Sequence, residues 1–485
     1  MVIRHQNRPF AVDNRTKFII AAIFGLMLIR ILAIFITPLG LDVEEAQYWL
    51  WSTTPSAGYF TKPPMIAWVI GIGTALAGEQ TFGVRLMAPI MQAISSLLIW
   101  RAASIAYTPA AGRWAALIWT SIPATALGGF IISTDSPMLV FLLSALLLLA
   151  PLAALRPINL TSALLAGIFT GLAMMSKYAA IYLPVGLVIW WGWQGRHHQL
   201  VTLRHVGLYA AGLAVSILPN LVWNLHNGFV TARHLSHNAN LEIPQYSLIS
   251  SIEFILSQAG IVGPIIFILA IIALIRGGKH GVFWLALFAP PIIVITIQAF
   301  LSDANANWAI ASWPAAVILL AGMLASAGPK LIRVGIVGIS FNALLAGGLI
   351  IAAMVGSFGQ FTPASDPLRR LKAWDDHRQD LIQFAEANGA STIITERRGV
   401  AAKLIWQLRD TSYVVELTDR NGIAENHFEQ QHPWTPTQGR KVILVNEEQA
   451  PSVLSGVTWH GVTASSYHQI SAKRQRQLVF HLGTE

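Results

Sequence analysis

The chain of 485 residues contains no cysteine, so disulfide bonds and thiolate metal sites are both excluded. Charged residues make up only 11% of the chain, whereas an ordinary soluble domain contains about 25%. Hydrophobic residues make up 54%. A soluble core does not need so large an apolar fraction, so the composition indicates a membrane protein.

The few charges are unevenly distributed. The first 355 residues hold 18 basic and 9 acidic side chains, and the last 130 hold 14 of each. The whole net positive charge therefore lies in the apolar part, where basic residues occur singly between apolar runs. This distribution favours orientation in a membrane over a nucleic-acid site, which would gather basic residues on one face. We therefore expect no nucleic-acid partner.

Apolar runs long enough, or nearly long enough, to cross about 30 Å of hydrocarbon recur through the first 356 residues. Eleven are expected, at 18–37, 84–104, 114–132, 136–155, 161–176, 178–194, 206–222, 255–275, 282–301, 308–327 and 331–356. Residues 1–356 are therefore predicted to form an all-α polytopic membrane domain with about 11 transmembrane helices.

Residues 357–485 have a different pattern. An amphipathic helix is expected at 366–389, ended by Gly389, and a second helix near 399–409. Short strands are expected at 391–395, 412–417, 441–446 and 476–481. This part is predicted to be a small C-terminal α/β domain outside the membrane.

Charge sorts the connections between spans into two sides. Single basic residues share one side with the basic N-terminus: Arg101, Arg113, Arg156, Arg196, Arg204, Arg276, Lys279, Lys330 and Arg333. By the positive-inside rule this side is the cytoplasm, and an odd number of spans then places residues 357–485 outside. Eight of the nine carboxylates of the first part fall on the outer side. Orientation does not require this bias, so it indicates a function.

The outward connection 38–83 carries three carboxylates in four residues, Asp42, Glu44 and Glu45. If the segment from Glu44 is helical, Glu44 and Tyr48 share one face. Apolar neighbours raise a carboxylate's proton affinity, which suits a general base, either Glu44 or Asp42. An interfacial helix with solvated acids and tryptophans at the membrane surface fits the same segment.

Three cations and another acid lie near the outer ends of spans. Lys62 precedes two prolines, which restrict the chain and would hold its ammonium near a lipid phosphate, although simple snorkelling fits equally. Arg85 lies at an outer span end, and Lys177 interrupts an apolar hairpin, where an intramembrane charge indicates function. Asp135 precedes Ser136-Pro137 and is suited to cap the next helix, a role that is compatible with catalysis.

Two further outward stretches carry polar side chains. The connection 223–254 contains His226, His234 and His237, whose spacing matches no specific metal pattern. Its amides, imidazoles and arginine suit sugar or phosphate binding, and equally describe a polar surface loop. Asn305 and Asn307 could line a sugar pocket, and a helix start at the interface explains them nearly as well.

Four segments of the chain resemble the bacterial glycosyltransferases related to protein O-mannosyltransferases and lipid A aminoarabinose transferases. The resemblance covers roughly the first 320 residues in order and spacing. It is carried by Glu44-Glu45-Ala46-Gln47-Tyr48-Trp49 through Gly58-Tyr59-Phe60-Thr61-Lys62-Pro63-Pro64, by Phe82-Gly83-Val84-Arg85-Leu86, by Thr134-Asp135-Ser136-Pro137, and by Gly171-Leu172-Ala173 through Ser176-Lys177-Tyr178. Members usually have an Asp-Glu pair where this chain has Glu44-Glu45.

The resemblance implies a GT-C fold in a bacterial inner membrane and a polyprenyl-phosphate sugar donor that enters from the outer leaflet. The acceptor would be a lipid, a glycan or a protein on the periplasmic side. Glu44 is expected to be the base, with Glu45 and Asp135 as supporting acids. The expected substrate-binding residues are Tyr59, Lys62, Arg85, Lys177, Tyr178, His234, Asn305 and Asn307. Thr61 replaces a glutamate that helps bind metal in the aminoarabinose branch, so no metal is expected at that position, although a divalent metal elsewhere stays open.

Two other classes share some of these features. A transporter or lipid flippase would also have many spans and polar intramembrane residues, but such proteins often contain internal repeats, and no clear repeat relates the two halves of this chain. A membrane-anchored scaffold would need neither eleven spans nor acidic outer loops. A glycosyltransferase is therefore the predicted function.

Overall fold

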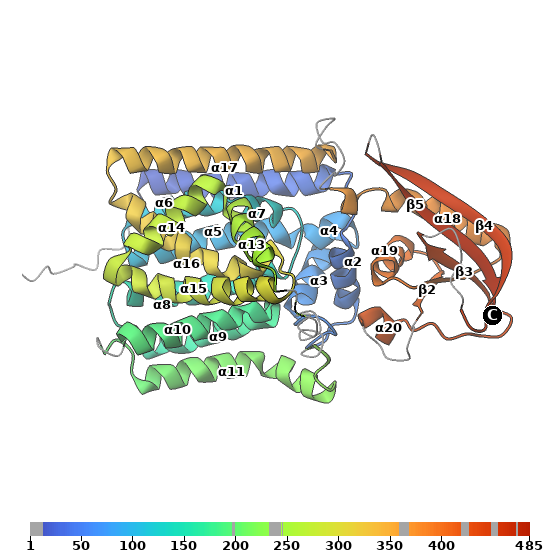
Figure 1. Ribbon diagram of the computed structural model, residues 1–485, viewed down its shortest axis with the longest axis horizontal. Helices are drawn as coiled ribbons and strands as arrows, with labels where there is room; N and C mark the ends of the chain where they lie inside the picture. Colours follow the sequence, from blue (N-terminus) through green and yellow to red (C-terminus); the bar gives the residue numbers. More distant parts are fainter. Residues whose placement is uncertain are drawn as a thin grey trace, which may run out of the picture.

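The computed structural model describes residues 13–195, 199–231, 244, 246–357, 368–418, 426–447, 454–471 and 474–485. A helical bundle and a smaller α/β domain lie end to end along the long axis of the molecule (Figure 1). Helix α17 (Pro329–Val355) is the last helix of the bundle, and it ends at Gly356, whose φ of +74° suits glycine.

The bundle contains helices of very different lengths. In the first half these are α1 (Asn14–Ile36), α2 (Val43–Thr53), α3 (Met65–Ala77), α4 (Thr81–Arg85), α5 (Met87–Ala106), α6 (Pro109–Ser121), α7 (Pro123–Leu127), α8 (Asp135–Ala153) and α9 (Leu160–Ser176). In the second half they are η1 (Tyr178–Ile181), α10 (Tyr182–Trp190), η2 (Trp191–Gly195), α11 (Leu203–His226), α13 (Leu248–Val262), α14 (Pro264–Arg276), α15 (Gly278–Leu301), η3 (Ala306–Ser312), α16 (Trp313–Ala325) and α17.

Seven helices of the described residues are long and apolar enough to cross a membrane, or eight if the bent pair α13 and α14 is one span. These helices carry apolar side chains on the faces that point away from the bundle as well as on the faces packed inside it. Among the outward-facing side chains, Phe18 of α1 is 75% exposed, Val215 of α11 is 70% exposed and Leu344 of α17 is 77% exposed. Such helices are stable only where lipid covers these faces. The chain is therefore a multi-span membrane protein.

Two of the expected spans differ in form from the prediction. The apolar run 255–275 is bent by 108° between α13 and α14, because Gly263 has a φ of +86° and Pro264 cannot continue the preceding helix. The run 114–132 is divided into α6 and α7 at Pro123, and no helix continues from Leu127 to Thr134. The count of eleven spans stays a prediction.

Different contacts mark the two ends of the bundle. Helix α1 begins at the end far from the α/β domain (Figure 1), where Asp13 pairs with Arg113 at 3.0 Å. At the opposite end, the Thr37 hydroxyl donates to the carbonyl of Ala353 at 2.6 Å and joins the last turns of α1 and α17. The acidic connection 38–83 leaves from this second end, beside the α/β domain, and most of it is helical rather than a loop.

The C-terminal domain contains a five-stranded sheet with the strand order β2-β1-β3-β5-β4. Strand β1 pairs in parallel with β2 and β3, and β5 pairs antiparallel with β3 and β4. Its elements are η5 (Arg369–Leu371), α18 (Trp374–Asn388), β1 (Thr392–Thr395), α19 (Arg398–Leu408), β2 (Val414–Leu417), α20 (His427–Gln431), β3 (Lys441–Asn446), β4 (Thr458–Ser471) and β5 (Arg474–Thr484).

The expected strands correspond to β1, β2, β3 and β5, and the expected helices to α18 and α19. Strand β4 was missed. Its sequence is largely polar, and a register shift between Trp459 and Thr463 interrupts the alternation that marks a strand.

Helix α19 joins the two parts of the molecule (Figure 1). One face packs on the sheet through Val400, Leu404 and Leu408. The other packs on α2, where Trp406 and Trp49 meet edge to face with ring centroids 4.7 Å apart. This packing places the first turn of α19 beside the acidic segment 42–48.

Candidate active site

The segment before α2 sets the direction of the two adjacent glutamates. Asp42 is the N-cap of α2, and a capping box joins it to Glu45: Asp42 accepts from backbone amides of the first turn, and the Glu45 carboxylate accepts from the Asp42 amide at 2.8 Å. Consecutive helix positions point about 100° apart, so Glu45 turns into the protein and Glu44 turns outward.

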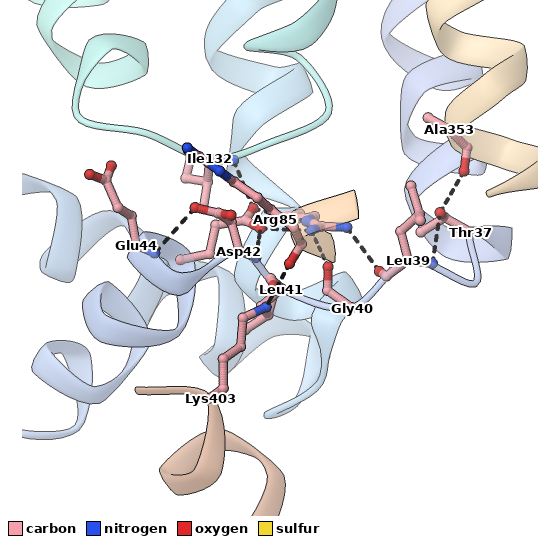
Figure 2. Close-up of polar contacts among 12 residues, drawn as sticks. Thr37, Leu39, Gly40, Leu41, Asp42, Glu44, Arg85, Ile132, Ala353 and Lys403 are labelled. Atoms are coloured by element: carbon pink, nitrogen blue, oxygen red, sulfur yellow. Dashed lines mark hydrogen bonds and ion pairs between the residues drawn. The ribbon is translucent and has the colours of Figure 1, made fainter. Parts of the chain in front are cut away.

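Glu45 and Arg85 form a fully buried ion pair. The Arg85 guanidinium donates to both carboxylate oxygens of Glu45, at 2.8 and 2.6 Å, and to the carbonyls of Leu39 and Gly40, at 3.2 and 2.7 Å. Glu45 also accepts from the Ile132 amide at 3.1 Å. The pair thus fixes the loop before α2 to the loop before α8 (Figure 2).

A cavity of about 650 Å³ lies between the bundle and the C-terminal domain. The bundle contributes Asp42, Val43, Glu44, Tyr48, Lys62, Ser133, Thr134, Asp135, Lys177, Asn305, Asn307 and Trp308. The C-terminal domain contributes Arg370, Trp374, Arg397, Arg398, Gly399, Val400, Glu447 and Arg476. Charged groups from eight separated segments of the chain therefore meet in one space.

Glu44 reaches this cavity as the exposed member of the glutamate pair. Its carboxylate accepts a hydrogen bond from the Tyr48 hydroxyl at 3.2 Å, the face pairing that helical spacing predicts. Burial and the Glu44 charge raise the pKa of Tyr48 well above its usual value, so the tyrosine stays a donor. Figure 2 shows the Glu44 carboxylate pointing away from the Arg85 network.

Asp135 is held from two sides. Its Oδ1 pairs with Lys177 Nζ at 2.7 Å, and its Oδ2 accepts from the Asn307 amide at 3.1 Å. Asp135 is the first residue of α8 and is not its N-cap, and the actual N-cap, Thr134, makes no side-chain cap. Asp135 therefore links three segments at the rim of the cavity.

Contacts within the loop that precedes α3 fix the backbone position of Lys62. The Lys62 carbonyl accepts from the Tyr59 amide at 3.2 Å, and Pro63 and Pro64 lead directly into α3. Burial lowers the pKa of Lys62, and the neighbouring cations Lys177 and Arg398 lower it further, while Glu44 raises it. An anion bound beside Lys62 would relieve this loss of solvation.

Six of the expected site residues line the cavity: Glu44, Lys62, Asp135, Lys177, Asn305 and Asn307. Glu45 and Arg85 do not, since both are fully buried in their ion pair, and this position disagrees with the expected contact between Arg85 and the donor phosphate. Tyr59 is also buried and donates to the Trp51 carbonyl at 2.8 Å, Tyr178 donates to Asn220 at 2.6 Å, and neither tyrosine lines the cavity. His234 lies outside the described residues.

Comparison with known proteins gives agreeing results. Residues 61–223 match the family model described as dolichyl-phosphate-mannose-protein mannosyltransferase. The lipid A galacturonosyltransferase RgtD of Rhizobium johnstonii is 31% identical over 439 residues, which cover 88% of this chain and 90% of that protein. The chain belongs to the GT-C family of membrane glycosyltransferases.

Solved structures of the transferase ArnT from Cupriavidus metallidurans have the same fold. The apo structure matches with a TM-score of 0.67 at 14% identity, covering 97% of this chain and 98% of that one. The structure bound to undecaprenyl phosphate matches with a TM-score of 0.68 at 14% identity, covering 96% and 98%. The predicted GT-C fold, with its small C-terminal domain, is therefore confirmed.

Sequence reasoning missed the contribution of the C-terminal domain to the glycosyltransferase cavity. Arg370, Arg397, Arg398 and Arg476 all line it. The arginine pairs at 369–370 and 397–398 are visible in the sequence, but nothing in the sequence shows that they fold back onto the segment around Glu44.

The structure also shows where possible metal ligands lie. Thr61 Oγ1 accepts from Gln47 at 3.3 Å and is buried, so it faces the Gln47 amide. Within the described ranges, three metal-ligating side chains come close together only in His377, Asp380 and His468. These three belong to the C-terminal domain and do not line the cavity.

Proposed function

We propose that this glycosyltransferase moves a sugar from a polyprenyl-phosphate donor to a lipid acceptor on the periplasmic side of a bacterial inner membrane. The observation that carries the proposal is one exposed carboxylate, Glu44, that shares a cavity with Lys62. The solved ArnT structure that binds undecaprenyl phosphate has the same fold, and RgtD is described as acting on lipid A. Both descriptions favour a phosphate-linked donor and a glycolipid acceptor.

The reaction needs one base and one place for a departing anion. An acceptor hydroxyl attacks the anomeric carbon, Glu44 takes its proton, and the bond between that carbon and the phosphate oxygen breaks. The electron pair of the broken bond leaves with the polyprenyl phosphate. Lys62 stabilises the charge that develops on this phosphate. A single displacement of this kind inverts the anomeric centre.

Glu44 suits the base better than Asp42 and Asp135, the other two carboxylates that the bundle contributes to the cavity. In the described part of the chain its carboxylate accepts only from the Tyr48 hydroxyl. Asp42 caps α2, and both oxygens of Asp135 are engaged by Lys177 and Asn307. Of these three, Glu44 alone can take up a substrate proton without losing a hydrogen bond to a charged group or to a helix end.

The remaining polar residues of the bundle have supporting roles in this proposal. Asn305 and Asn307 lie at the rim and can donate to sugar hydroxyls. Asp135 holds Lys177 and Asn307 in place, so it is a positioning residue. Glu45 and Arg85 position the loops that carry Glu44 and Asp135. We do not assign Tyr59, Tyr178 or Arg85 to substrate contact.

The orientation follows from the charge of the two ends. The end with the Asp13–Arg113 pair is the cytoplasmic one in this proposal, and the cavity opens at the periplasmic end. A reporter enzyme fused after residue 485 is expected to be active only in the periplasm. Cytoplasmic activity of the reporter would invert this topology.

The function is tested with purified protein in lipid nanodiscs, a radiolabelled polyprenyl-phosphate sugar and a lipid A acceptor. We expect labelled glycolipid, free polyprenyl phosphate and an inverted anomeric centre. Glu44→Gln should lower turnover by about 10²–10⁴-fold, and the protein should keep its melting temperature. Glu79→Gln is the matched control, because Glu79 is exposed at the same end and does not line the cavity.

Two results would contradict the proposal. Full turnover of Glu44→Gln would remove Glu44 from the mechanism. Movement of labelled lipid between leaflets, without any covalent product, would instead indicate the flippase class.

A further inference from the structure

The wall of the cavity that belongs to the C-terminal domain is strongly basic. It carries Arg370, Arg397, Arg398 and Arg476 against a single acid, Glu447. The wall formed by the bundle has the opposite balance, with three carboxylates and two lysines. Lys62 belongs to the bundle wall, so its contact with a donor phosphate does not explain the excess of four arginines on the other wall.

Three of these arginines form no direct ion pair with an acid among the residues that the structure describes. Arg397 pairs with Glu447 at 2.7 Å in an exposed ion pair. Arg370 is exposed to the cavity, and Arg398 donates to the neutral Gln47 amide oxygen at 3.1 Å. Unpaired guanidinium groups that line one wall attract oxyanions.

Arg476 is held rigidly in the same wall. Its guanidinium lies over the Trp374 ring, 4.3 Å from the centroid, and donates to the Arg369 carbonyl at 2.9 Å. Its buried Nε has no hydrogen-bond partner in the described part of the chain. A fixed arginine loses little conformational freedom when it binds an anion.

Arg398 is positioned by the bundle as well as by its own helix. The Gln47 amide that accepts from Arg398 donates in turn to Thr61, next to Lys62. Gly399, the next residue, lies against the Val43 side chain of α2. The packing of α19 against α2 therefore places Arg397 and Arg398 at the cavity.

We infer that this arginine wall binds a second anionic group of the substrates, a phosphate or a carboxylate, distinct from the donor phosphate. The inference rests on the proposed function. An anion on the acceptor or on the transferred sugar cannot occupy the position of the donor phosphate, so it needs cations of its own, which the arginine wall contains. The anion belongs either to the acceptor or to the transferred sugar.

The test compares four substrate combinations in nanodiscs. The donors are a polyprenyl-phosphate uronic acid and the matching neutral hexose, and the acceptors are phosphorylated and enzymatically dephosphorylated lipid A. For substrates that carry the recognised anion, Arg370→Gln and Arg398→Gln should each raise KM about 10–100-fold, because each variant loses one charge-assisted hydrogen bond to that anion. KM for the neutral counterpart should stay within about twofold. Arg474→Gln, exposed on β5 outside the cavity, is the control.

The pattern identifies the source of the anion. A loss confined to phosphorylated lipid A assigns the wall to the acceptor, and a loss confined to the uronic acid donor assigns it to the sugar. Equal losses for all four combinations would overturn the inference, because the wall would then hold the donor phosphate or only support the fold. Unchanged KM values in both variants would overturn it too.

A binding measurement separates this inference from the proposed function. If no combination yields product, the proposed function fails. Native mass spectrometry can still compare retention of phosphorylated and dephosphorylated lipid A by the wild type and Arg398→Gln. Preferential retention of the phosphorylated lipid by the wild type, lost in the variant, would support an anion-binding wall. Equal retention of the two forms of lipid A by the wild type would show that the wall does not bind phosphate. Equal retention of the uronic acid donor and the neutral donor, measured in the same way, would show that it does not bind carboxylate.

Discussion

The two walls of the cavity differ in how their charges are held. In the bundle wall Asp42 is fixed as a helix cap and Asp135 is fixed by Lys177 and Asn307, whereas Glu44 accepts only from the neutral Tyr48 hydroxyl among the described residues. In the C-terminal wall the cations exceed the acids, and they are held by a tryptophan ring, backbone carbonyls and a neutral amide. The first arrangement suits proton transfer at one defined position. The second suits the binding of an anionic group.

The largest effect is expected when the support of the bundle wall is removed. Glu45→Ala leaves the buried Arg85 charge unpaired, which should lower the free energy of unfolding by about 3–5 kcal/mol. The melting temperature in detergent measures it. Replacing both residues, as in Glu45→Met with Arg85→Met, should recover part of the loss, because no unpaired charge remains. If Glu45→Ala keeps the wild-type melting temperature but loses turnover, Glu45 acts in catalysis and not in support.

A smaller effect should follow the loss of Lys62 from the bundle wall. Lys62→Met removes the proposed phosphate ligand, so KM for the polyprenyl-phosphate donor should rise about 10–100-fold. KM for the acceptor should change little. Lys330→Met, at the opposite end of the bundle and exposed, is the control. An equal rise for both substrates would show that Lys62 does not distinguish donor from acceptor.

The smallest effect concerns Lys403, which connects the segment before α2 to the C-terminal domain. Lys403 of α19 bonds to the carbonyls of Leu41 and Arg370, and burial lowers its pKa to about 8. At pH values between this pKa and the usual lysine pKa of about 10.4, Lys403 is protonated more fully in the unfolded chain than in the folded protein. Stability should therefore rise with pH in this window, by about 1 kcal/mol between pH 8 and 9.

This pH dependence is measured as the difference between wild type and Lys403→Met. The variant should show a flatter dependence of melting temperature on pH above 8, since it has no buried ammonium to deprotonate. Identical slopes in the two proteins would show that Lys403 keeps its proton throughout.

Much of the bundle site could be predicted because its signals are local. Acids in adjacent helix positions, a lysine before two prolines and a lysine inside an apolar hairpin are all visible in a few neighbouring residues. The separate roles of Glu44 and Glu45 were not visible, because only the contact with Arg85, 40 residues away, shows which glutamate is buried. Because this contact also buries Arg85 away from the cavity, Arg85 is not placed to bind the donor phosphate as expected.

The sequence by itself determined the membrane character, the charge bias between the two ends and most elements of the small α/β domain, because hydropathy and periodicity are properties of consecutive residues. Only the tertiary structure decided that α13 and α14 bend apart, that Glu45 is buried, and that α19 brings arginines to the cavity. Those outcomes depend on packing between segments far apart in the chain. No local pattern records which of two neighbouring side chains such packing will bury.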